Sequence, residues 1–220
     1  MIKAVIFDLD GTLLNRNASL QTFIEFQYER LKNCFIHIPK ELYISRFIEL
    51  DCRGYVWKDK VYQQLIQEFN IKGITWEQLL QDYLAEFKNH CIPFPNLIRM
   101  LEAIKKQSIL IGIITNGMGQ FQMDNITALG IKKYFKTIHI SEWEGVKKPN
   151  PEIFEKALKQ LNVLANESVY IGDHPENDVI AARKVGMKTI WKRDIQWDGC
   201  KADFIIEDLG EILSIIEKLL

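Results

Sequence analysis

The sequence lacks any long hydrophobic run. Its apolar stretches are short, as in Ile109 to Ile114, whereas a membrane-spanning helix needs about 20 consecutive apolar residues. Near the N-terminus, four apolar residues separate Lys3 from Asp8, and this run is too short for the apolar region of a secretory signal. We therefore expect a cytoplasmic protein with no membrane partner.

Cysteine is scarce, and net charge is almost absent. The four cysteines are scattered and form no Cys-x-x-Cys pair, so without an export signal we expect reduced thiols. The 28 Lys and Arg residues nearly balance the 29 Asp and Glu residues, giving a formal net charge of −1. No overall field therefore favours a nucleic acid polymer or an anionic membrane as partner. The composition, 47% hydrophobic and 26% charged, is typical of a globular protein.

Strand patterns are missing between Leu14 and Ile92. Apolar residues there recur at helical spacing, which predicts four helices, beginning near Ala18, Pro39 and Trp57 and after Thr75. Thr75 has the position of an N-cap, with Gln78 completing a capping box. Pro93-Phe94-Pro95 then forms a stiff connector. We expect residues 15–92 to form an inserted all-α domain, a helical-bundle cap.

The rest of the chain, residues 1–14 and 93–220, alternates between strands and helices. This alternation predicts an α/β core with a doubly wound, mostly parallel sheet. No internal repeat or low-complexity tract is present. The expected strands lie at about residues 4–7, 108–114, 137–140, 168–171, 188–191 and 204–206.

Two carboxylates follow the first apolar strand. Asp8 and Asp10 share a side-chain direction if the strand continues, because the side-chain period of a strand is two. Gly11 then permits an immediate turn. Two neighbouring negative charges are costly unless a divalent cation or a shared proton neutralises them. A simple turn after the strand would also explain these aspartates. The residues at the other strand ends therefore decide between a turn and a ligand site.

Two more buried strands end in polar residues, Thr115-Asn116 and Gly172-Asp173. In a doubly wound sheet, such ends converge on one crevice. Lys148 precedes a further helix and adds a cation. Carboxylates, a hydroxyl, amides and a lysine are the groups that phosphoryl transfer requires, because positioning and charge stabilisation supply most of its catalysis.

These residues resemble the motifs of the haloacid dehalogenase-like (HAD) superfamily, in the branch with a helical cap inserted after the first motif. This branch includes phosphatases, nucleotidases and phosphomutases. The resemblance implies a Rossmann-like core and covers that core rather than the cap. The four motifs, in order, are Asp8-Leu9-Asp10-Gly11-Thr12, Thr115-Asn116-Gly117, Lys148-Pro149 and Gly172-Asp173-His174-Pro175-Glu176-Asn177-Asp178.

The resemblance implies the roles of the acidic residues. Asp8 is the expected nucleophile, which forms an aspartyl-phosphate. Asp10 is expected to protonate the leaving group and then to activate water. The cofactor is expected to be Mg²⁺, held by Asp8, the backbone carbonyl of Asp10, and Asp173. Asp178 is expected to bind a metal-bound water or to orient the lysine of the third motif.

The resemblance also assigns the phosphate-binding groups. Thr115, a backbone amide near Asn116, and Lys148 are expected to bind the phosphoryl group. Lys147 is a weaker candidate for the cationic role, because Lys148 is the residue before proline, as in the family. His174 is expected to be a bystander, since Mg²⁺ prefers oxygen ligands.

The cap carries one candidate specificity loop, beginning at the helix break Asp51-Cys52-Arg53-Gly54. Arg53 and Lys58 are candidates for binding a second phosphate or a carboxylate, and Tyr55 or Trp57 for stacking on a base or sugar ring. Solvated charges and aromatic residues of the cap core would explain the same residues equally well.

We expect a Mg²⁺-dependent phosphatase that acts on a small phosphomonoester, either a nucleotide or a sugar phosphate, as a monomer or homodimer. The alternative is a phosphomutase acting on a hexose phosphate. A phospholigand-binding protein and a 2-haloacid dehalogenase remain as further readings. Asp10 argues against the dehalogenase, because dehalogenases of the family lack this aspartate.

Overall fold

The structure is a computed structural model that describes residues 1–219. The chain divides into two compact units, and each is described here by itself. Residues Met1–Asn15 and Pro93–Leu220 form the larger unit, and Arg16–Ile92 form the smaller one.

The larger unit contains a sheet of six parallel strands in the order β3-β2-β1-β4-β5-β6. The order reverses on either side of β1, as in a doubly wound fold, and the expected α/β class is confirmed. The strands are β1 (Ala4–Phe7), β2 (Leu110–Thr115), β3 (Thr137–Ile140), β4 (Ser168–Gly172), β5 (Lys188–Lys192) and β6 (Phe204–Ile206).

The register brings the polar strand ends together. Phe7 lies opposite Ile113 of β2 and Ile171 of β4, so the three strands run level. The residues that follow Phe7 therefore emerge beside the ends of β2 and β4. Because parallel strands share one carboxyl edge, this edge is where a ligand site is expected.

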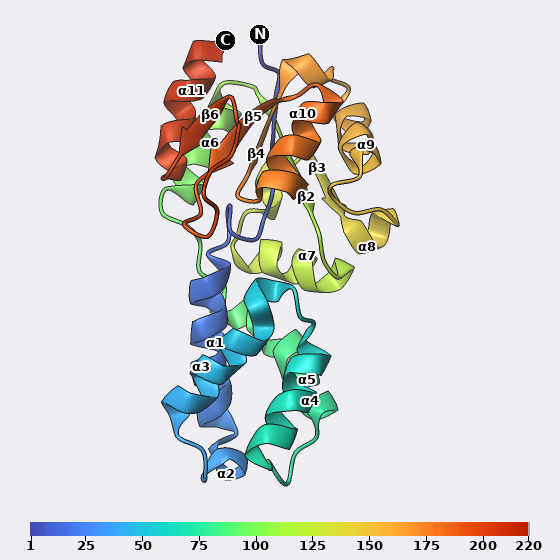
Figure 1. Ribbon diagram of the computed structural model, residues 1–220. Coiled ribbons are helices and arrows are strands. Elements are labelled where there is room, and N and C mark those ends of the chain that lie inside the picture. The colour runs from blue at the N-terminus through green and yellow to red at the C-terminus, as the bar shows by residue number, and fades with distance from the viewer. Residues whose placement is uncertain (220) are drawn as a thin grey trace. The chain divides into compact units, whose positions relative to one another are not determined.

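Helices cover both faces of the sheet (Figure 1). On one face α6 contacts α11, and on the other α9 contacts α10. The helices α6, α9 and α11 have strongly amphipathic sequences, so each buries one apolar side against the rest of the unit. The helices of this unit are α6 (Leu97–Lys106), α7 (Gly119–Ala128), α8 (Ser141–Glu144), α9 (Pro151–Leu161), α10 (Ala181–Val185) and α11 (Ile212–Leu219), with a π-helical segment at Pro175–Ile180 before α10.

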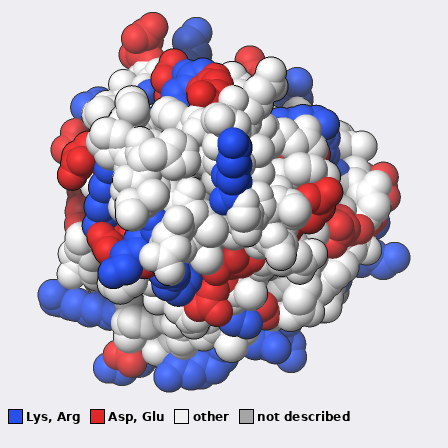
Figure 2. All heavy atoms as spheres, turned by 90° about the horizontal axis from the view of Figure 1, so that it is seen from below, with Lys and Arg blue, Asp and Glu red and all other residues white. Residues whose placement is uncertain are grey.

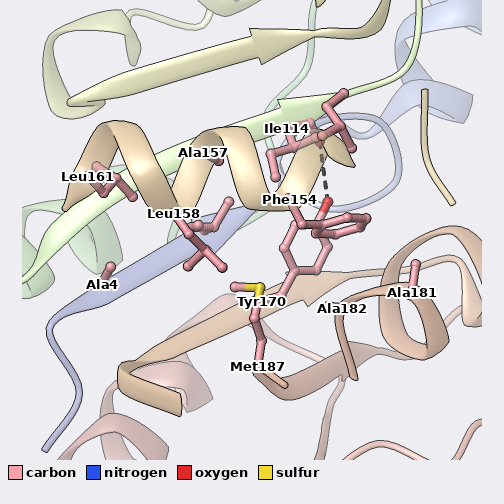
Figure 3. Packing of buried hydrophobic residues seen from close by; sticks show 12 residues of the cluster. Ala4, Ile114, Phe154, Ala157, Leu158, Leu161, Tyr170, Ala181, Ala182 and Met187 are labelled. Atoms are coloured by element: carbon pink, nitrogen blue, oxygen red, sulfur yellow. Dashed lines mark hydrogen bonds between the residues drawn. The ribbon is translucent and has the colours of Figure 1, made fainter. Parts of the chain in front are cut away.

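The core beneath α9 and α10 is apolar apart from one hydroxyl (Figure 3). Phe154 of α9 packs edge-on against Tyr170 of β4, with ring centroids 5.0 Å apart. The Tyr170 hydroxyl lies 3.3 Å from the carbonyl oxygen of Ile114. One buried side chain therefore links the apolar core to the end of β2.

The smaller unit is helical, and no strand occurs in it. Its fourth expected helix begins at a capping box, which is confirmed: the Thr75 hydroxyl accepts from the Gln78 amide, and the Gln78 side chain accepts from the Thr75 amide. Its helices are α1 (Arg16–Arg30), α2 (Lys32–Phe35), α3 (Lys40–Asp51), α4 (Lys58–Phe69) and α5 (Trp76–Glu86), with shorter turns at Cys52–Gly54 and Phe87–His90.

The distribution of surface charge and the state of the cysteines agree with the expectations from the composition. On the face displayed in Figure 2, Lys and Arg are interspersed with Asp and Glu rather than gathered into a single basic area. Across residues 1–219, no helix is both long and apolar enough to span a bilayer. None of the four cysteines forms a disulfide.

Candidate active site

The first motif leaves the sheet directly after the expected first strand. β1 ends at Phe7, although the amide of Asp8 still donates to the Ile171 carbonyl of β4 at 2.9 Å. The chain then turns at Gly11, whose φ is +82°. A Cβ atom at Gly11 would lie only 2.3 Å from Oδ2 of Asp173, so glycine lets the first and fourth motifs approach closely.

Lys148 is buried between two carboxylates. Its ammonium donates to Oδ1 of Asp8 at 2.5 Å and to Oδ1 of Asp178 at 2.6 Å. Burial by itself would lower the pKa of Lys148, but Asp178 and Asp8 outweigh that effect and hold the pKa well above its usual value. The lysine is therefore charged, and it fixes one oxygen of each carboxylate.

Asp8, Asp173 and Asp178 form a carboxylate cluster in which the three nearest oxygens lie within 4.8 Å of one another. Burial raises the pKa of Asp8 to about 7, and Asp178 adds to this effect while Lys148 opposes it. Burial and the charge of Asp8 raise the pKa of Asp173 well above its usual value. One ammonium offsets only one of the three negative charges, so the cluster fits a divalent cation bound through oxygen.

The hydrogen bonds distinguish Asp173 from the other two carboxylates. Both oxygens of Asp178 accept hydrogen bonds, Oδ1 from Lys148 and Oδ2 from the His174 amide at 3.0 Å. Both oxygens of Asp8 accept hydrogen bonds as well. Within residues 1–219, no hydrogen bond reaches the carboxylate of Asp173. Asp173 is therefore the carboxylate that the protein's own hydrogen bonds leave most open to a divalent cation. Asp178 is positioned to orient Lys148, which is one of the two roles that the resemblance implies for it.

The second and third motifs are joined by a reciprocal pair of hydrogen bonds. The Asn116 side chain donates to the Lys148 carbonyl at 3.0 Å and accepts from the Lys148 amide at 2.9 Å. Thr115 ends β2 next to Asn116 and is almost fully buried. The larger unit therefore brings together every core residue expected from the sequence.

Several residues of the site were missed in the sequence. Thr12 donates to Oδ2 of Asp8 at 3.2 Å, and the Tyr170 hydroxyl accepts from Lys148 at 3.1 Å. Gln122 of α7 contacts the side chains of Asp10 and Thr115. Tyr170 and Gln122 carry no sequence signal, because their partners are distant in the chain.

Two missed residues lie at the end of β5. The Trp191 indole donates to the Asp173 carbonyl at 2.7 Å, and the Lys192 ammonium donates to the Gly11 carbonyl at 3.1 Å. Burial lowers the pKa of Lys192. Both residues lie at the carboxyl end of a strand, which is the criterion that identified the other candidate residues in the sequence. The sequence therefore contained a signal for them.

The candidate specificity residues lie in the smaller unit. Tyr55 is 64% exposed, and Arg53 is exposed with a left-handed backbone at φ 59°. Lys58 is buried, and its ammonium pairs with Asp51, which also accepts from Arg16 at 2.9 Å. This position favours a structural role for Lys58, since its charge is compensated inside the unit.

The family comparison agrees with this geometry. The model of the haloacid dehalogenase-like hydrolase family matches residues 5–192, most of the chain. The chain therefore belongs to the haloacid dehalogenase-like hydrolase family.

Individual relatives indicate which kind of hydrolase the chain is. A glyceraldehyde 3-phosphate phosphatase from Pyrococcus furiosus is 30% identical over 99% of this chain and 94% of its own length. The pyrimidine 5'-nucleotidase YjjG from Escherichia coli is 37% identical over 71% of this chain and 70% of its own. The crystal structure of an HAD phosphatase from Thermococcus onnurineus matches with a TM-score of 0.70 and 26% identity, covering 98% of both chains. The chain is thus a phosphoric monoester hydrolase of this family.

Proposed function

We propose that this enzyme is a Mg²⁺-dependent phosphatase that acts on a small phosphorylated metabolite through an aspartyl-phosphate at Asp8. The arrangement around Asp8 carries the proposal: a buried carboxylate next to the cation of Lys148 and to the carboxylate of Asp173, which accepts no hydrogen bond from residues 1–219. Asp10, two residues further on, supplies a second carboxylate that is more accessible to solvent.

The reaction has two steps in this proposal. A carboxylate oxygen of Asp8 attacks the phosphorus, the bond from phosphorus to the ester oxygen breaks, and the leaving oxygen takes a proton from Asp10. Asp10 then removes a proton from water, whose oxygen attacks the phosphorus. The bond to Asp8 breaks, and inorganic phosphate is released with Asp8 restored as a carboxylate.

The chain's own groups stabilise the transferred charge. Lys148 and the Thr115 hydroxyl bind the phosphoryl oxygens, and an amide near Asn116 assists them. When bound, Mg²⁺ supplies further charge neutralisation through Asp8, the Asp10 carbonyl and Asp173. Asp178 holds Lys148 in place through its hydrogen bond.

A short sugar phosphate is the substrate class that we propose first. The relatives named glyceraldehyde 3-phosphate phosphatase align over nearly the whole chain, including residues of the smaller unit. The nucleotidase relative aligns over less of the chain. Arg53 and Tyr55 remain our candidates for substrate selection in the smaller unit.

The test is phosphate release from a panel of phosphomonoesters, with and without Mg²⁺. The panel contains glyceraldehyde 3-phosphate, pyrimidine 5'-monophosphates and glucose 1-phosphate. We expect Mg²⁺-dependent release, with the triose phosphate cleaved fastest. Isomerisation of glucose 1-phosphate would identify a mutase. Binding without turnover, or chloride release from 2-chloropropionate, would contradict the proposal. The cytoplasmic location and the monomeric or dimeric state stay predictions.

A further inference from the structure

The buried side of α7 is polar, which is unusual for a helix that packs on a protein interior. Its buried residues are Gly119, Gln122, Asn125 and Ile126, so two of the four carry side-chain amides. Gln122 is 2% exposed and Asn125 is fully buried. Burying an amide is costly unless its hydrogen bonds are satisfied, so the partners of these two side chains matter.

Gln122 bridges the first and second motifs. Its Nε2 atom donates to Oδ2 of Asp10 at 2.6 Å and lies 2.9 Å from the Thr115 hydroxyl and 3.0 Å from the Asn116 carbonyl. Elsewhere in residues 1–219, no other hydrogen bond to the Asp10 carboxylate is present. Asp10 and Gln122 are 112 residues apart in the chain, so only the fold brings them together.

The direction of the Gln122 amide is determined by its surroundings. Asn125 donates to Oε1 of Gln122 at 3.2 Å. A reversed amide would place Oε1 against the Asp10 carboxylate and the Asn116 carbonyl, both of which are acceptors. Gly117 makes room for the side chain, because a Cβ atom there would lie 2.9 Å from Cγ of Gln122.

We propose that Gln122 is a positioning residue for proton transfer to the leaving group, an inference that rests on the proposed phosphatase function. By binding Oδ2, it leaves Oδ1 of Asp10 to face the leaving-group oxygen. By donating to the Thr115 oxygen, it also fixes the position of that hydroxyl at the end of β2. One amide thereby holds the acid and a phosphate donor in a single orientation.

This role has a kinetic signature that structural damage lacks. Acidic leaving groups such as 4-nitrophenolate depart without a proton, whereas alkoxides of sugar phosphates require one. The value of kcat/KM covers all steps up to the formation of the aspartyl-phosphate. Loss of Gln122 therefore affects kcat/KM more for alkyl phosphates than for 4-nitrophenyl phosphate.

The experiment compares wild-type enzyme with Gln122→Met and Gln122→Glu on 4-nitrophenyl, phenyl and sugar phosphates at saturating Mg²⁺. We expect Gln122→Met to lower kcat/KM for the sugar phosphate by about 10- to 100-fold and to affect 4-nitrophenyl phosphate much less. Gln122→Glu keeps the size of the side chain, so it tests the positioning role of Gln122 if the methionine variant does not fold. It places a carboxylate against Asp10 and is expected to show at least as strong a selectivity.

The matched control is Gln120→Met. Gln120 lies on the same helix, is exposed, and donates to Asp124 at 2.7 Å, so the same substitution removes a similar bond away from the site. It is expected to match wild type on every substrate. An equal loss on all leaving groups, or no loss, overturns the positioning role while the phosphatase function stands. An inactive wild-type enzyme would overturn both.

Discussion

At the residue scale, the site depends on charge balance around one lysine. Lys148 is the only ammonium that contacts the carboxylate cluster within the described chain, and Asp8 and Asp178 each give it one oxygen. Its neighbour Lys147 is exposed. The two adjacent lysines therefore offer a direct comparison between a buried cation in the site and a solvated one.

Replacing Lys148 with Met is expected to lower kcat by about 10²- to 10³-fold, the usual cost of removing one preorganised donor for developing charge. Lys147→Met serves as the control and is expected to stay within about twofold of wild type, because an exposed lysine contributes little. Steady-state kinetics on the best substrate measures both. Similar losses in the two variants would show that the assignment to Lys148 is wrong.

The raised pKa of Asp8 predicts that Mg²⁺ binding depends on pH. Below pH 7 the metal-free carboxyl is largely protonated, so Mg²⁺ must displace a proton before it binds. The affinity is expected to weaken by at least about tenfold for each pH unit below 7, because the pKa of Asp173 is raised as well. Calorimetric titration of the metal-free protein at several pH values measures this. An affinity that does not change between about pH 5 and pH 7 would contradict a protonated Asp8.

At the element scale, close packing at the end of β4 determines the position of Asp178 in the fourth motif. A Cβ atom at Gly172 would lie 2.3 Å from Cγ of Asp178, with no positive φ involved. Gly172→Ala is therefore expected to displace Asp178 and lower kcat/KM by at least about tenfold, because small misplacements in a site are costly.

A double-mutant cycle isolates this effect. If Gly172→Ala acts through Asp178, it lowers kcat/KM much less in an Asp178→Ala background than in the wild-type enzyme. Equal costs in the two backgrounds would mean that the alanine disturbs β4 itself.

Elements with strong local signals could be predicted from the sequence. The apolar periodicity of residues 97–106 and 151–161 predicts two amphipathic helices, and the structure has helices with these bounds. The π-helical turn at Pro175–Ile180 was not foreseen, since its shape follows from the His174 and Asp178 contacts rather than from periodicity.

At the scale of the whole molecule, most core residues of the candidate site could be predicted because they follow strands of one parallel sheet, and Lys148 because it precedes the proline of the third motif. Gln122 and Tyr170 could not, because their partners are distant in the chain. Their partners are fixed by the packing of α7 and β4. The roles of Arg53 and Tyr55 in the smaller unit stay predictions.

Metal binding is expected to stabilise the folded chain. A ligand at about 100 times its Kd contributes about 2.7 kcal/mol, which corresponds to a rise in Tm of roughly 5–10 °C for a chain of this size. Calorimetry with and without Mg²⁺ measures the shift. Asp173→Asn is expected to reduce it strongly, because Asp173 is the carboxylate without a protein donor. The same shift in the variant would exclude Asp173 as a ligand.

The covalent intermediate tests the central claim most directly. Enzyme turning over 4-nitrophenyl phosphate, whose leaving group departs without a proton, is quenched in acid and analysed by intact-protein mass spectrometry and peptide mapping, with Asp10→Asn used to slow hydrolysis of the intermediate. We expect one phosphoryl group on Asp8, its absence in Asp8→Asn, and no change in a control variant of the exposed Asp198. Undiminished phosphate release by Asp8→Asn, or turnover that never labels Asp8, would contradict the account.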